Sequence, residues 1–243
     1  MTTPVAGIII GNEVLTAKVT DANGPLLVKR LRDRGLALAL LATVPDDVDA
    51  IVETVQLARR RARNIVTSGG IGPTHDDVTV RAVALALGRR VVRLPEIEAK
   101  VKEHYGKRAT PQAMRLADAP EGAELVYQDG IWYPVLACDG VFMLPGVPDL
   151  FRIQLETVLG RLPRGTLTTA AMYLSATEPE IARALDEVAL SMPHVPIGSY
   201  PTFDASLGYK VKVTVEHPEP GPVREVVARL EKLLPAGCIL RLE

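Results

Sequence analysis

Short apolar runs alternate with segments of helical periodicity along the first part of the chain. The runs consist largely of Val, Ile, Leu and Ala, which is typical of strands buried on both faces of a sheet. The segments between them repeat apolar side chains every three or four positions, as amphipathic helices do. This alternation predicts βαβ units, a mostly parallel sheet and helices on both of its faces. The predicted strands cover residues 5–10, 36–44 and 64–66, and the predicted helices cover 21–34, 46–61 and 80–87.

The middle of the chain departs from this alternation. Two apolar runs, 131–137 and 141–144, flank Asp139-Gly140, a dipeptide that favours a tight turn between antiparallel strands. The second run leads into a Pro-Gly-Val-Pro turn, which either faces a ligand or only ends a strand and starts a helix. Helices are predicted at 95–107, 110–116 and 148–162.

A second alternation begins after residue 164. Its order is strand, helix, strand, strand, helix, strand, which is the order of a ferredoxin-like βαββαβ unit. We therefore expect two domains, 1–164 and 165–243, of which the second is a small α+β domain. The predicted strands of this domain cover 166–174, 195–200, 209–216 and 238–242, and its helices cover 178–190 and 223–234.

The composition is that of an ordinary soluble globular protein, with 47% hydrophobic and 23% charged residues among 243. A formal net charge of -1 gives no reason to expect nucleic acid or an acidic membrane surface as a partner. The two cysteines, Cys138 and Cys238, lie far apart, which argues against a disulfide scaffold and favours a reducing cytoplasm. The chain shows no basic n-region and no apolar run of bilayer length, so we expect neither a signal peptide nor a membrane span.

The densest group of candidate functional residues follows the third predicted strand, in residues 67–79 (TSGGIGPTHDDVT). Glycines between a strand and a helix allow positive φ and bring backbone N–H groups close to a ligand. The following helix N-terminus adds unpaired N–H groups and a partial positive charge, which suit phosphate or pyrophosphate. Asp76 and Asp77 would repel such a ligand unless a divalent cation lay between them, because hard cations prefer carboxylate oxygen. The segment therefore predicts a metal-assisted site for a phosphorylated ligand.

A purely structural interpretation of such loops is also available, since an Asp or Thr before a helix often serves only as an N-cap. Capping needs one side chain, however, and this loop combines several polar residues with three glycines. Loops 11–13 and 45–47 also follow predicted strands, and ligands of parallel sheets bind at this carboxyl edge. For Asp46, a site role and a helix cap remain equally open, and His75 is either a general base or a loop residue.

These residues resemble a known family. Residues 11–15 (GNEVL) with 21–23 (DAN) are similar to the G-D-E-L-L…D-T-N opening of competence/damage-inducible protein A, CinA, of the molybdopterin-binding superfamily that includes MogA, MoaB and gephyrin. Residues 67–79 resemble the family's T-T-G-G-L-G-P-T-H-D-D-x-T, and residues 144–148 resemble its L-P-G-V-P. The resemblance spans nearly the whole chain and is closest to the molybdopterin-binding-like domain of eukaryotic FAD synthase. Asn12, Ala17 and Ala22 depart from the usual Asp, Gly and Thr.

The resemblance implies a three-layer α/β/α fold that handles a pterin or an adenine dinucleotide. Relatives of the CinA and FAD synthase type are associated with metal-dependent hydrolysis of FAD or ADP-ribose at the pyrophosphate, which releases AMP. Members of the MogA type instead adenylylate molybdopterin with ATP and magnesium. We therefore expect a nucleotide pyrophosphatase that uses Mg, Mn or Co. Adenylyl transfer to molybdopterin and a non-catalytic pterin- or nucleotide-binding regulatory module remain the alternatives, and a homo-oligomer is left open.

Each candidate site residue has an expected role. Backbone N–H groups of residues 69–72 are expected to hold phosphate oxygens, and the carboxylates are expected to hold the metal and orient water. The expected catalytic residues are Asp77, Asp46 and Glu13; the expected metal ligands are Asp77, Asp46 and Asp76; and the expected phosphate- or nucleotide-binding residues are Ser68, Gly69, Gly70, Gly72, Thr74, Thr79 and Gly146.

Overall fold

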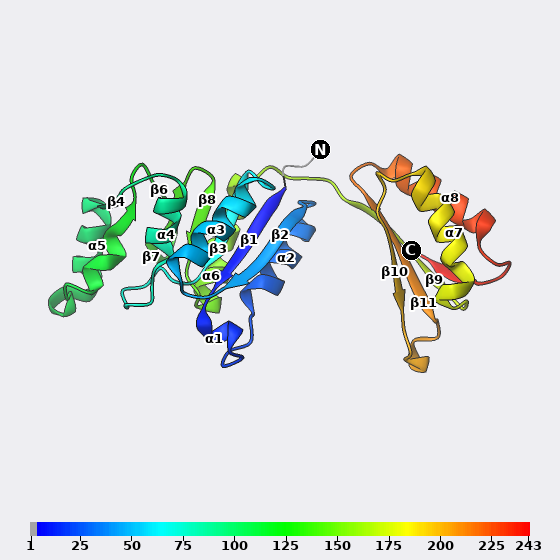
Figure 1. Cartoon of the computed structure of the whole chain (residues 1–243), viewed down its shortest axis with the longest axis horizontal. Coiled ribbons are helices and arrows are strands. Elements are labelled where there is room, and N and C mark those ends of the chain that lie inside the picture. The colour runs from blue at the N-terminus through cyan, green and yellow to red at the C-terminus, as the bar shows by residue number, and fades with distance from the viewer. Residues whose placement is uncertain (1–3) are drawn as a thin grey trace. The chain divides into compact units, whose positions relative to one another are not determined.

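The computed structural model of the chain describes residues 4–243. Residues 1–3, on which the expectation about a signal peptide partly rests, lie outside the described residues. The chain divides into two compact units that meet between Arg164 and Gly165 in the sequence (Figure 1). Within residues 4–243, no helix combines the length and the apolar character needed to cross a membrane.

A six-stranded sheet forms the centre of the N-terminal unit, in the order β2-β1-β3-β8-β7-β6. The first four of these strands are parallel, and β7 and β6 are antiparallel to their neighbours. The wholly buried β1 lies between β2 and β3, the position that a continuous apolar run predicts. The strands are β1 (Val5–Ile10), β2 (Leu38–Val44), β3 (Asn64–Ser68), β6 (Glu124–Gln128), β7 (Ile131–Cys138) and β8 (Val141–Leu144).

Helices cover both faces of this sheet, which confirms the predicted three-layer α/β fold (Figure 1). One core cluster joins the sheet to Leu27 and Phe151 of two helices, and the other joins it to Ile51, Val83 and Ile97 of three helices. The first pair of helices is α2 (Asn23–Asp33) and α6 (Pro148–Arg161), and the second group is α3 (Val48–Arg59), α4 (Thr79–Ala86) and α5 (Pro95–Tyr105).

Several short elements were not predicted. The strands β4 (Val91–Arg93) and β5 (Asp118–Pro120) form a separate two-stranded sheet, and three residues are too few to show a period. The predicted helix at 110–116 is wrong, because this segment holds only the 3₁₀ turn η2 (Ala113–Ala117). A one-turn helix, α1 (Asn12–Leu15), follows β1, and a 3₁₀ turn, η1 (Gly106–Arg108), follows α5.

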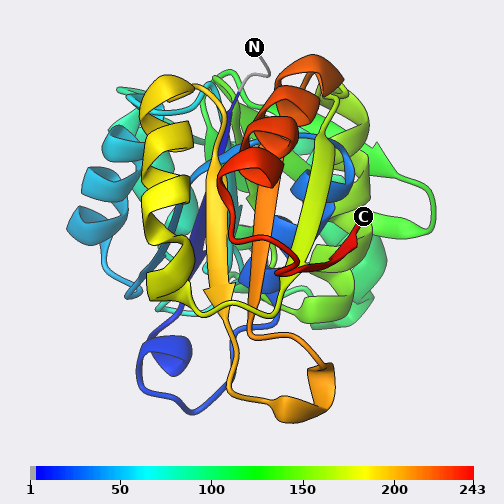
Figure 2. The ribbon, with the colours of Figure 1, turned by 90° about the vertical axis from the view of Figure 1, so that its right-hand side faces the viewer.

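The C-terminal unit is a four-stranded antiparallel sheet in the order β10-β11-β9-β12. Two helices pack side by side on one face of it (Figure 2). The element order confirms the predicted βαββαβ unit, with a short 3₁₀ turn, η3 (Ala205–Leu207), before the third strand. The main elements are β9 (Thr168–Leu174), α7 (Glu178–Ser191), β10 (Ile197–Pro201), β11 (Val211–His217), α8 (Pro220–Leu233) and β12 (Ile239–Leu242).

Candidate active site

Four loops meet at the carboxyl edge of the parallel strands β1, β2, β3 and β8. Strand β7 runs the other way, with Leu136 opposite Met143, so its first residues lie at this same edge. A cavity of ≈ 690 Å³ opens here. Eight of the candidate site residues line it: Glu13, Asp46, Gly69, Gly70, Gly72, Asp76, Asp77 and Gly146.

The loop after β3 has a backbone that only glycine accommodates. Gly69 and Gly70 have φ of +105° and +65°. A Cβ at Gly69 would lie 2.1 Å from the Ile10 carbonyl oxygen, and a Cβ at Gly70 would lie 2.3 Å from the Thr79 Oγ1. Glycine is therefore needed at both positions, because it adopts positive φ without strain and because it leaves room for the neighbouring atoms.

The amide groups of this loop divide into two kinds. The Gly69 N–H donates to the Leu144 carbonyl oxygen at 3.0 Å, so it is already used within the fold. Among the hydrogen bonds of the described residues, none has the N–H of Gly70, Ile71 or Gly72 as its donor. Three backbone N–H groups of the loop are therefore free to donate to a ligand, and the predicted phosphate site needs such donors. Gly69 instead fixes the conformation of the loop through its hydrogen bond to Leu144.

The hydroxyl residues of the loop support it and do not line the main cavity. Thr79 is fully buried, and its Oγ1 donates to the Gly69 carbonyl oxygen at 2.8 Å. Ser68 is also buried, and its Oγ accepts a hydrogen bond from Asn23 Nδ2 at 2.9 Å. The Thr74 hydroxyl donates to Asp76 Oδ1 at 2.6 Å, and the Thr74 N–H donates to Asp77 Oδ2 at 2.7 Å. All three side chains are thus occupied in holding the loop.

Asp46 is not a helix cap. The N-cap of α3 is Asp47, whose Oδ1 accepts from the Ala50 N–H at 2.9 Å. Asp46 instead accepts from the Asn12 N–H at 2.8 Å and lines the cavity. Burial raises the pKa of Asp46 above its ordinary value, and the neighbouring charges of Glu13, Asp76 and Asp77 raise it further. Asp46 therefore lies within the electrostatic influence of the three other carboxylates that line the cavity.

Asp76 and Asp77 have different surroundings. The Thr74 hydroxyl lowers the pKa of Asp76, a side chain that is open to solvent. Asp77 is half-buried and lies under Gly72, where an added Cβ would come within 2.6 Å of its Oδ2. His75 is 95% exposed, with its Nδ1 3.8 Å from Asp76 Oδ1, and it does not line the cavity. His75 is therefore not positioned as a general base for a ligand in the cavity.

The carboxylates do not form a closed metal site. In the part of the chain that the structure describes, no group of three or more His, Cys, Asp or Glu side chains is arranged to hold a metal ion. Magnesium in nucleotide sites commonly takes one or two carboxylates and completes its shell with water and substrate phosphate oxygens. Asp46 and Asp77 therefore fit a cation that is shared with a phosphorylated ligand and do not fit an all-protein site.

Asn23 joins three of the loops. Its Nδ2 donates to Ser68 Oγ at 2.9 Å and to the Gly146 carbonyl oxygen at 2.8 Å. Its N–H and that of Gly24 donate to Asp21 Oδ1, both at 2.9 Å, so Asp21 accepts from the first turn of α2, whose N-cap residue is Ala22. The residue thereby ties the start of α2 to the ends of β3 and β8.

Aromatic side chains form the opposite wall of the cavity. Tyr105, Trp132 and Tyr133 line it, with ring centroids of Trp132 and Tyr133 5.4 Å apart and those of Tyr105 and Trp132 5.9 Å apart. The Tyr133 hydroxyl donates to the Leu116 carbonyl oxygen at 3.0 Å, and burial raises the pKa of this phenol. A wall of this kind suits a flat heteroaromatic ring.

Residues 6–164 match the family model described as "Probable molybdopterin binding domain". The chain belongs to the molybdopterin-binding domain family. Residues 166–243 of this molybdopterin-binding-domain protein match a second model, the middle domain of FAD synthase.

Individual relatives agree with these matches. A protein of Archaeoglobus fulgidus is 33% identical over 229 residues, covering 93% of this chain and 96% of its own. A CinA-like protein of Geobacter metallireducens is 31% identical over 82% of this chain, and a "Probable FAD synthase" of Caenorhabditis elegans is 29% identical over 96% of it. The aligned regions cover 52% and 50% of the latter two proteins, so the chain corresponds to about half of each.

A solved structure also matches the N-terminal unit. The crystal structure of the protein CinA with unknown function from Thermoplasma acidophilum superimposes with a TM-score of 0.61 at 28% identity. The match covers 66% of this chain and 98% of that one. The molybdopterin-binding domain thus shares its fold with a CinA protein.

Sequence reasoning missed two features of this molybdopterin-binding domain. One is the aromatic wall, which a signal in the sequence could have revealed: in a chain with 4% aromatic residues, the only tryptophan is followed directly by a tyrosine. The other is Asn23, because no pattern in the sequence indicates that its side chain joins the ends of β3 and β8. The Pro-Gly-Val-Pro turn lines the cavity through Pro145, Gly146 and Val147, which supports the ligand-facing alternative for this turn.

Proposed function

We propose that the molybdopterin-binding domain of this chain is a metal-dependent nucleotide pyrophosphatase that hydrolyses FAD or ADP-ribose and releases AMP. The observation that carries the proposal is the composition of one cavity. It combines unused loop amides, four carboxylates and an aromatic wall, and its volume is ≈ 690 Å³. A dinucleotide needs each of these parts: donors for the phosphates, acidic groups for a cation, and a surface for a flat ring.

The protein groups act on the substrate in distinct ways. The N–H groups of Gly70, Ile71 and Gly72 bind phosphate oxygens and stabilise the negative charge that grows on them in the transition state. Trp132, which stacks on His104 with one face at 4.2 Å, packs its other face against the base or flavin ring and fixes the position of the pyrophosphate. Tyr133 stands at 68° to Trp132 and borders the same subsite. Glu13, on the one-turn helix after β1, orients the attacking water and accepts its proton.

A divalent cation held by Asp46, Asp77 and the substrate would neutralise phosphate charge and favour the ionised form of the attacking water. Asp76 adds negative charge beside this pair. Water forms a new bond to one phosphorus while the bond from that phosphorus to the bridging oxygen breaks. The products are AMP and a second phosphate monoester, so atoms and charge balance without a further reactant.

The test is release of AMP from FAD or ADP-ribose in the presence of magnesium, manganese or cobalt, followed by chromatography. Asp77→Ala should abolish the release, and Asp77→Asn, which keeps the side-chain shape, should lower the rate roughly 100-fold or more. Asp49→Asn is the matched control, because Asp49 is exposed on α3 and does not line the cavity. An unchanged rate in both Asp77 variants would refute the site assignment.

Two alternatives have support of their own. Membership of the molybdopterin-binding domain family favours adenylyl transfer to molybdopterin. With ATP and molybdopterin in place of the dinucleotide, this reaction would release pyrophosphate and leave the adenylyl group on molybdopterin, and chromatography separates both products from AMP. The unused loop amides and the rings that line the cavity would also serve a non-catalytic binding module. That alternative predicts tight binding of a pterin or nucleotide with no turnover in any of the three metals.

A further inference from the structure

A second cavity, of ≈ 520 Å³, adjoins the main one. Pro73 and Tyr105 line both cavities, so these two side chains are the wall between them. The second cavity is also lined by His75, Arg108 and Arg115, and we call it the basic groove. No part of the proposed hydrolysis uses these three residues.

The two arginines of the basic groove have no carboxylate partner among the described residues, whereas its imidazole, His75 Nδ1, lies 3.8 Å from Asp76 Oδ1. In the described part of the chain, neither Arg108 nor Arg115 forms an ion pair, and Arg115 Nη1 only donates to the Thr74 carbonyl oxygen at 3.4 Å. Nearby arginines differ in this respect: Arg89 pairs with Asp139, Arg90 with Glu121 and Arg93 with Asp118.

The two cavities have opposite charge. Carboxylates line the main cavity, whereas two guanidinium groups and an imidazole line the basic groove on the other side of Pro73 and Tyr105. A ligand that spans both would place one anionic group near the shared cation and a second one directly on arginine. Guanidinium groups bind phosphate through paired N–H donors, and the side chains of Thr110 and Gln112 in the groove add further hydrogen-bonding capacity.

We propose that the basic groove binds a phosphate monoester carried by the nucleotide that occupies the main cavity. The preferred ligand class is therefore a nucleotide with a phosphate on a ribose hydroxyl in addition to its 5′-phosphate or pyrophosphate. This inference relies on the proposed function only for the presence of a nucleotide in the main cavity. It does not require hydrolysis.

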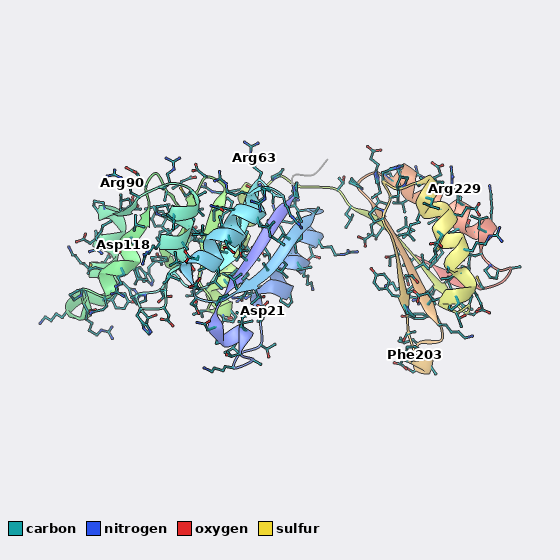
Figure 3. All side chains as sticks on the ribbon, viewed as in Figure 1. Asp21, Arg63, Arg90, Asp118, Phe203 and Arg229 are labelled. Carbon is teal, nitrogen blue, oxygen red and sulfur yellow. The ribbon has the colours of Figure 1, made fainter. Side chains whose placement is uncertain are left out.

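The first test measures binding without metal, by calorimetry at low ionic strength. Adenosine 2′,5′-bisphosphate and adenosine 3′,5′-bisphosphate are compared with AMP, and at least one bisphosphate should bind about tenfold more tightly. The double variant Arg108→Gln, Arg115→Gln should lose this advantage while its affinity for AMP stays unchanged, which also shows that the main cavity is intact. Arg90→Gln, a change at an exposed and paired arginine of the same unit (Figure 3), should keep the advantage.

The second test locates the contact by NMR of the arginine Nε–Hε groups. Adenosine bisphosphate should shift the signals of Arg108 and Arg115, and AMP at the same concentration should leave them in place. Inorganic phosphate added together with AMP distinguishes the other source of the same chemistry. Equal shifts with that mixture would show an independent anion site and overturn the inference.

The outcomes separate this inference from the proposed function. If both bisphosphates bind no more tightly than AMP, or if the advantage survives in the double variant, the basic groove has no such role, whatever the rate of hydrolysis. If the advantage is present and depends on the two arginines, the inference holds even when no dinucleotide is cleaved. Raising the salt concentration should reduce the advantage, because exposed charges are screened.

Discussion

Gly70 and Gly88 form a matched pair for testing why the loop after β3 needs glycine. Their φ angles are +65° and +66°, so replacing either by alanine introduces the same backbone strain. They differ in their surroundings: a Cβ at Gly88 meets nothing within 4 Å, whereas a Cβ at Gly70 would lie 2.3 Å from Thr79 Oγ1. The difference between the two variants therefore isolates the contact with Thr79.

The size of the effect follows from these contacts. A left-handed alanine costs about 1 kcal/mol, which is the whole expected loss of unfolding free energy for Gly88→Ala. Gly70→Ala must in addition displace the buried Thr79 hydroxyl from the Gly69 carbonyl oxygen, which it contacts at 2.8 Å. Leaving buried polar groups without partners costs about 1–3 kcal/mol, so Gly70→Ala should cost about 3 kcal/mol in total.

Urea unfolding followed by Trp132 fluorescence is the assay, because the only tryptophan of the chain lies in the N-terminal unit. A double-mutant cycle adds a second check. In a Thr79→Ala background the clashing hydroxyl is gone, and Gly70→Ala should then cost only about 1 kcal/mol, as at Gly88. Equal losses for Gly70→Ala and Gly88→Ala, or strict additivity in the cycle, would refute the explanation.

Three further predictions concern the same unit. Asn23→Ala removes the hydrogen bonds from the Asn23 side chain to Ser68 Oγ and to the Gly146 carbonyl oxygen, so the free energy of unfolding should fall by about 2 kcal/mol. A loss of less than about 0.5 kcal/mol in urea titration would contradict this role of Asn23. The folded-state pKa of Asp46 is raised above 3.8, so this carboxyl stabilises the fold at lower pH and the effect is lost as pH rises through the folded pKa. Asp46→Asn should therefore gain stability relative to the natural protein as the pH is raised in metal-free buffer, and a constant difference at every pH would contradict that sign. Trp132→Ala should weaken FAD binding roughly tenfold or more in calorimetry while the affinity for inorganic pyrophosphate stays unchanged, and parallel losses for both ligands would speak against a ring-binding wall.

Elements with a long and regular apolar pattern could be predicted from the sequence. The run that became β1 had no polar residue, and its predicted and observed bounds are both Val5–Ile10. The two-stranded sheet of β4 and β5 could not be found in this way, because each strand has three residues and pairs across a separation of more than twenty positions. Local pattern carries no information about such a pairing.

The candidate site shows a similar division. Glycines and aspartates at strand ends could be predicted to gather at one edge, because parallel strands all end on the same side. Whether a loop hydroxyl turns toward a ligand or back into the fold depends on its φ, ψ and neighbours, and Ser68 and Thr79 turn inward. The antiparallel pairing of β7 with β8, which Asp139-Gly140 predicts, brings the first residues of β7 to the cavity, but the apolar pattern of this strand does not show that its rings line a cavity.

The reversed direction of β7 has a consequence for how such domains diverge. In the proposed function the backbone that binds phosphate belongs to the turn after β3, whereas two of the three rings that line the cavity, Trp132 and Tyr133, come from the hairpin of β6 and β7, a separate stretch of sequence. Substitutions in the hairpin can alter which aromatic ring of a ligand binds and leave the loop amides after β3 unchanged. A single scaffold of this kind can therefore evolve toward flavins, adenosines or pterins by editing one peripheral hairpin.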